Sequence, residues 1–171
     1  MDDVASGAVR YLAQSSAIRS LLGFIPASDP NQANVGQPFI FRANLLATLE
    51  GTSQAAIVCS DFGGFEAPVE YSTQRFQRLS VEFYVDALRD SSNNVIESPG
   101  ATAGRCNNIF SVVHGYLQRR DPETIVWGDL VTLGCALRAE GRTQPSPDGD
   151  WMQYKQVFYE VRLGGFTDIA L

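Results

Sequence analysis

Few side chains in this 171-residue sequence could carry out acid–base or nucleophilic chemistry. His114 is the single histidine, and at 100° per residue it falls in the apolar stripe of an expected helix, which is typical of a packed structural histidine. The three cysteines, Cys59, Cys106 and Cys135, are widely spaced among apolar neighbours without a C-x-x-C motif. The sequence therefore predicts no catalytic residue, no metal site and no cofactor.

Two acidic motifs have ordinary structural explanations. The triplet Asp61-Phe62-Gly63 matches the magnesium-binding motif of protein kinases, but the chain has one lysine and no glycine-rich phosphate loop. Asp148 and Asp150 lie in a polar loop without the ligand spacing of a calcium site. Both motifs are interpreted as turn chemistry, and an enzyme or small ligand-binding domain is a distant alternative.

Hydrophobic periodicity predicts two main helices. Residues 4–22 place their apolar side chains on one stripe, and Ser15-Ser16 offers an N-cap that would divide this helix in two. Ser98 followed by Pro99 predicts the start of a helix that continues to Leu117, because proline suits the first helical position.

Alternation of apolar and polar residues predicts the strands. The clearest strand is 75–87, and 131–137 and 157–163 show the same period of two. A short apolar run at 55–60 and a segment beginning at Phe39 are expected strands as well. The predicted fold is α+β: a mostly antiparallel sheet of about four to five strands, with the two main helices on one face, in a single domain over residues 1–171.

Charge and hydropathy limit the partners. The sequence has 13 basic and 19 acidic side chains, a net charge of −6, and no basic cluster with which to hold nucleic acid. The longest apolar stretch, near 130–137, is too short to cross a bilayer, and we expect a soluble protein without a membrane partner.

The remaining candidate site is a protein interface. Phe62 and Phe65 flank two glycines within residues 61–74, a connection too long and too apolar for a simple turn. Tyr84 and Phe158 are expected on the polar faces of their strands. These rings either reach a partner or fold back over the domain's own core. The candidate interface residues are Phe62, Gly63, Gly64, Phe65, Tyr71 and Trp151.

A series of local patterns extends over nearly the whole chain. They are Ile18–Gly23, Ile40-Phe41-Arg42 followed by residues 55–64, then residues 77–84, 105–117 and 156–162. In this order they resemble the tail terminator (tail completion) proteins of long-tailed bacteriophages. The loop at 26–38 has no counterpart that we can assign in that family.

The resemblance implies a non-enzymatic role in virion assembly. Proteins of this family form a hexameric ring on the growing tail tube, stop its polymerisation and present a surface to the head connector. The implied partners are further copies of the chain, the tail tube protein and the head–tail connector or stopper protein, and DNA would pass through without specific binding. The implied location is the tail or neck of a virion assembled in the host cytoplasm. A neighbouring neck protein, such as a head-completion or connector subunit, is the main alternative.

Overall fold

The computed structural model describes residues 3–22, 39–42, 55–69, 72–118, 125–146 and 153–164. The loop at 26–38 lies outside these residues. In chain order the described elements are the helices α1 (Val4–Ala13) and α2 (Ser16–Leu22), the strands β1 (Ile40–Arg42), β2 (Ala55–Val69) and β3 (Ser72–Val85), the helix α3 (Pro99–Leu117), and the strands β4 (Ile125–Trp127), β5 (Leu130–Glu140) and β6 (Gln153–Leu163).

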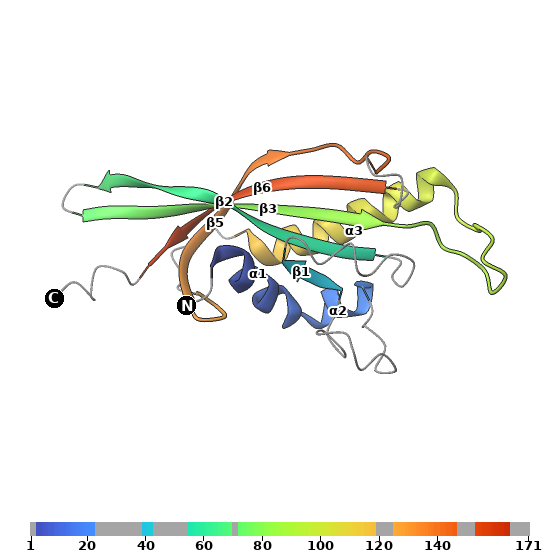
Figure 1. Ribbon diagram of the computed structural model, residues 1–171, viewed down its shortest axis with the longest axis horizontal. Helices are drawn as coiled ribbons and strands as arrows, with labels where there is room; N and C mark the ends of the chain where they lie inside the picture. The colour runs from blue at the N-terminus through green and yellow to red at the C-terminus, as the bar shows by residue number, and fades with distance from the viewer. Residues whose placement is uncertain are drawn as a thin grey trace.

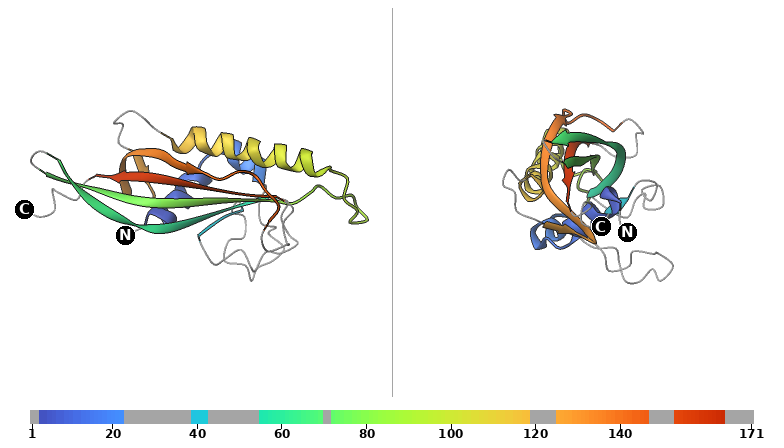
Figure 2. Two further views of the ribbon diagram at one scale, coloured as in Figure 1. Left: turned by 90° about the horizontal axis from the view of Figure 1, so that it is seen from above. Right: turned by 90° about the vertical axis from the view of Figure 1, so that its left-hand side faces the viewer.

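The six strands form one sheet in the order β1-β2-β3-β6-β5-β4. Strand β1 is parallel to β2, and every other pair is antiparallel. The sheet curls strongly, as the end-on view in Figure 2 shows. The α+β class and the mostly antiparallel sheet agree with the sequence-based prediction. The predicted strand number was too low, because β4 has three residues and so short a strand shows no clear alternation.

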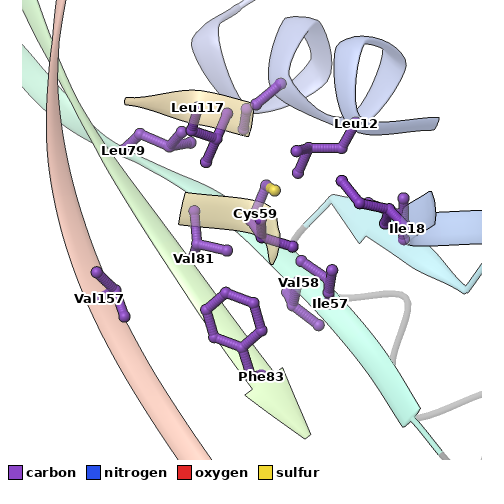
Figure 3. Packing of buried hydrophobic residues seen from close by; sticks show 14 of the residues in the cluster. Leu12, Ile18, Ile57, Val58, Cys59, Leu79, Val81, Phe83, Leu117 and Val157 are labelled. Carbon is purple, nitrogen blue, oxygen red and sulfur yellow. The ribbon is translucent and has the colours of Figure 1, made fainter. Parts of the chain in front are cut away.

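The helices cover one face of the sheet and enclose the main core. Leu12 of α1, Ile18 of α2 and Leu117 of α3 converge on Cys59 of β2 and Val81 of β3 (Figure 3). Both predicted helical segments are present. The predicted break in the first segment is also present, since the Ile18 N–H donates to Ser15 Oγ at 3.3 Å at the start of α2.

The start of α3 is fixed by side chains on both sides of the predicted cap. The Ala101 N–H donates to Ser98 Oγ at 3.2 Å, which satisfies one free donor of the first turn. Glu97 accepts two hydrogen bonds from Arg105, at 3.0 Å to Oε1 and 3.2 Å to Oε2. These bonds from Arg105 hold the pKa of Glu97 below its ordinary value. The loop before α3 is thereby tied to the second turn of the helix.

Strands β2 and β3 extend beyond the helices as an arm (Figure 1). Strand β6 stays paired with β3 as far as Arg75, so only residues 67–69 and 72–74 continue as two strands alone. We call residues 61–69 and 72–78 the arm. The prediction of a long connection over 61–74 was wrong, because both strands extend through it and pair from Ala55↔Val85 to Val69↔Ser72. The glycines that suggested a turn lie instead at a register shift between Asp61 and Gly64, inside the strand.

Two smaller expectations also need correction. Tyr84 is buried rather than exposed, and its ring lies 5.1 Å from that of Tyr154 on the neighbouring strand β6. The expected alternation of β5 is interrupted by register shifts at Thr132/Gly134 and Leu137/Ala139, so Leu130, Thr132 and Cys135 are its buried residues. A bulge inserts one residue and reverses the phase of the alternation, which a regular period of two cannot anticipate.

Candidate protein interface

The single histidine lies in a packed, hydrogen-bonded setting on α3. His114 Nδ1 lies 3.0 Å from the hydroxyl oxygen of Tyr159, and the imidazole stacks against the rings of Phe110 and Tyr159. Burial raises the pKa of Tyr159, so this phenol keeps its proton. The arrangement matches the structural histidine expected from its place in the apolar stripe.

The three cysteines are free and buried in the structure. Burial raises the pKa of Cys59 to about 12 and that of Cys106 to about 11, and it raises the pKa of Cys135 as well. A thiol held in this way is neutral at physiological pH and a poor nucleophile or metal ligand. Within the described residues, no group of three or more His, Cys, Asp and Glu side chains could hold a metal ion.

The candidate interface residues of the arm are organised by the bulge in β2. Gly63 has φ +78°, a conformation that favours glycine, and its N–H donates to Asp61 Oδ1 at 2.8 Å. Gly64 approaches β3 so closely that a Cβ atom there would clash with the carbonyl oxygen of Phe76 and lie 2.7 Å from the Gln77 side chain. Both positions therefore require glycine because of the bulge within β2, and not because they lie in a connecting loop.

The bulge places Phe62 and Phe65 on the same face of the sheet. Residues three apart on a regular strand point to opposite faces, but the extra residue between Asp61 and Gly64 restores the phase. Phe62 meets Phe158 edge-on at 5.3 Å between ring centroids, and Phe65 stacks on Phe76 at 5.0 Å. Because Phe158 pairs with Ser80, this face is opposite to the one that carries Val81 and the helices. We call it the helix-free face.

Four rings thus form an aromatic row on the helix-free face: Phe62, Phe65, Phe76 and Phe158. Phe62 is 56% exposed and Phe65 is 39% exposed, and the guanidinium of Arg78 lies 5.6 Å from the Phe65 ring centre. Three of these rings were predicted from the sequence as possible contact residues, and Phe76 was not. Phe76 could have been found from its spacing: it lies two residues before Arg78 in the clearest predicted strand, so both side chains are on the same, polar face.

Other candidates are not described by the structure. Tyr71 and Trp151 both lie outside the described residues, so their roles stay predictions. Phe62, Gly63, Gly64 and Phe65 are brought together at one point of the arm. Exposed aromatic rings that rest on other rings supply a contact surface with little side-chain entropy to lose on binding.

Comparison with known proteins yields a structural neighbour. No model of a known protein family matches the sequence, and no curated protein matches it. A solved chain described as "Virion of native gene transfer agent (GTA) particle" matches with a TM-score of 0.57 and 10% sequence identity. The match covers 95% of this chain and 95% of that chain. The chain therefore shares its fold, over nearly its whole length, with a chain of a gene transfer agent virion particle.

None of the helices in the described part of the chain is both long and apolar enough to cross a bilayer.

Proposed function

We propose that this protein is a structural component of a phage or phage-like virion, and more specifically a tail terminator. In this role it forms a ring on the tail tube, ends tube polymerisation and joins the tail to the head connector. The observation that carries the proposal is the fold shared over 95% of both chains with a component of a gene transfer agent virion. The local sequence patterns resembling tail terminators give the more specific assignment.

The surface chemistry supports an assembly role. The arm projects from a well-packed body and exposes aromatic rings, which are typical anchors of protein interfaces. The three buried thiols are not activated nucleophiles, and His114 is held in a hydrogen bond to Tyr159. We infer a non-enzymatic role.

The charge of the chain fits a ring through which DNA passes. A net charge of −6 repels the phosphates of DNA, and the chain has no cluster of basic residues with which to hold them. We propose that DNA moves through such a ring without specific binding.

A neighbouring position in the neck is the second candidate. The structural neighbour is described as the virion particle as a whole, and a head-completion or connector subunit would be compatible with the same fold likeness. The two roles differ in the particle that carries the protein before head and tail join, because a terminator belongs to the free tail and a connector to the head.

The experiment that tests the proposal is removal of this protein from an otherwise complete assembly system. Without a terminator the tail tube continues to grow, so micrographs should show tails of abnormal and variable length, separate from filled heads. Restoring the wild-type chain should restore uniform tail length. Tails of normal length that fail to join heads would assign the protein to the connector instead, and normal particles would contradict both roles.

A further inference from the structure

We propose that Arg78 and Arg162, on the helix-free face, bind a carboxylate of another virion protein, and that Phe62 and Phe65 contact an apolar side chain of the same segment. The occupant of this site is an acidic segment, with an apolar residue nearby, of a protein other than this chain. The inference rests on the proposed function only in taking that partner from the same particle. It deepens the function by naming the residues that receive the partner and the chemistry that they recognise.

The strand register brings the two arginines together on the helix-free face. Arg78 of β3 pairs with Glu160 of β6, and Arg162 lies two residues further along β6, on the same side of the sheet. Residues related in this way have Cα atoms about 7–8 Å apart, within reach of two long side chains. Two guanidinium groups at this spacing can donate hydrogen bonds to the two oxygens of one carboxylate.

Neither arginine has an acidic partner among the described residues. The carboxylate of Glu160, directly across from Arg78, accepts instead from Arg138 Nη2 at 2.8 Å. Arg162 Nε is buried and has no hydrogen-bond partner within the described part of the chain. A buried donor without an acceptor is destabilising, so an acceptor supplied from outside the subunit would satisfy it.

The aromatic row holds the Arg78 side chain and supplies the apolar part of the site. The guanidinium of Arg78 lies over the Phe65 ring, 5.6 Å from its centre, and that ring stacks in turn on Phe76. A guanidinium that lies on a ring keeps the N–H groups at its edge for hydrogen bonds. Phe62 and Phe65 remain 56% and 39% exposed, so an apolar side chain beside the bound carboxylate would cover them.

Carboxylates of this chain are largely engaged with other groups of the same subunit. The ion pairs printed by the structure join acidic residues to cations other than Arg78 and Arg162: Asp3–Arg42, Asp86–Arg89, Glu97–Arg105, Glu140–Lys155 and Glu160–Arg138. On the arm, Asp61 and Glu66 pair with Leu79 and Arg75, which places them on the opposite face of the sheet. This use of the described carboxylates favours a carboxylate from a different protein over one from a second copy.

A protein carboxylate fits this face better than the phosphates of a nucleic acid. Glu82 and Glu160 lie on the same face as Arg78, and the chain has a net charge of −6, so a polyanion would be repelled beyond the two arginines. The Phe65 ring already stacks on Phe76 and carries Arg78, which occupies surface on which a base would stack. A single carboxylate meets only the local pair of positive charges.

Calorimetric titration of the full chain with each purified structural protein of the same particle tests this site. The wild type should bind one of these proteins, and added salt should weaken that binding. A double variant, Arg78→Glu with Arg162→Glu, should bind the same protein at least about tenfold more weakly. Arg142→Glu is the matched control, because it makes the same change of charge at an exposed site after β5 and should bind like the wild type. The double variant should melt at the same temperature as this control.

Charge reversal in the partner gives a second readout. Each Asp and Glu of the bound protein is replaced by Arg in turn, and one replacement should restore binding to the double variant while weakening binding to the wild type. Full binding by the double variant, no binding of the wild type to any protein of the particle, or no restoring replacement would overturn the site.

Other occupants of the site are distinguished by two further measurements. Binding of oligothymidylate by the wild type, lost in the double variant, would assign the arginines to phosphates instead. Self-association of the wild type, lost in the double variant, would assign them to a second copy, and either result would overturn the proposal. Abnormal tails after removal of the protein, together with full binding by the double variant, would leave the proposed function intact and overturn only this site.

Discussion

Replacing Phe62 by alanine distinguishes a surface contact from a core residue. The ring is 56% exposed and rests edge-on against Phe158 at 5.3 Å, so truncation removes less than half of the burial of a core phenylalanine together with one aromatic pair. Partial burial of this size contributes about 1 kcal/mol, and a ring pair adds about 0.5–1.5 kcal/mol that partly overlaps with it. We expect Phe62→Ala to lower the free energy of unfolding by about 1–1.5 kcal/mol.

Phe83→Ala is the matched control for this variant. Phe83 lies on the neighbouring strand β3 and is fully buried beneath α3, where it meets Phe110 at 5.8 Å. Removing such a ring costs about 3–5 kcal/mol, because a cavity remains. For a chain of this length each kcal/mol lowers the melting temperature by about 2–4 °C. Calorimetry of the monomer should therefore show a shift roughly three times larger for Phe83→Ala. A Phe62→Ala shift as large as that of Phe83→Ala would refute the assignment of this ring to the surface.

Three further predictions concern the arm, α3 and the thiols. Gly64→Ala should destabilise the protein by about 1–3 kcal/mol in denaturant unfolding, because the added methyl group clashes with the carbonyl of Phe76. Gly104→Ala is the control: a Cβ atom there meets no atom within 4 Å, so this change should stabilise α3 by about 0.5–1 kcal/mol. Glu97→Gln should lower the free energy of unfolding by about 1–2 kcal/mol at pH 7. Because the folded pKa of Glu97 is lowered, the difference between the variant and the wild type should vanish as the pH falls below 4.5. A difference that stays constant with pH would contradict the ion pair. Cys135→Ala should cost about 1–3 kcal/mol, and assembly should be unchanged in native mass spectra.

Features encoded by neighbouring residues could be predicted from the sequence. Ser98 followed by Pro99 defines the start of α3 because the cap and the proline act within a single turn. The buried positions of β6 follow the alternation of Val157, Tyr159 and Val161 because that strand is paired with β3 without interruption over its whole length. A capping motif and a regular alternation were sufficient to predict the start of α3 and the buried positions of β6.

Features that depend on distant strands could not be predicted. Gly63 and Gly64 have the composition of a turn, and only their pairing with β3 shows that they form a bulge within a strand. Tyr84 has the phase of a surface residue, yet it is buried against Tyr154, which is seventy positions away in the chain. The side chain that a strand residue meets is set by register, and register is a property of the whole sheet.

The position of the protein in the particle tests the central proposal most directly. Antibody labelling of separated tails and heads in electron micrographs would give this position before the two parts join. We expect one label at the head-proximal end of each free tail and none on free heads. Label on the heads alone, or on neither part, would contradict the assignment of this protein as a tail terminator.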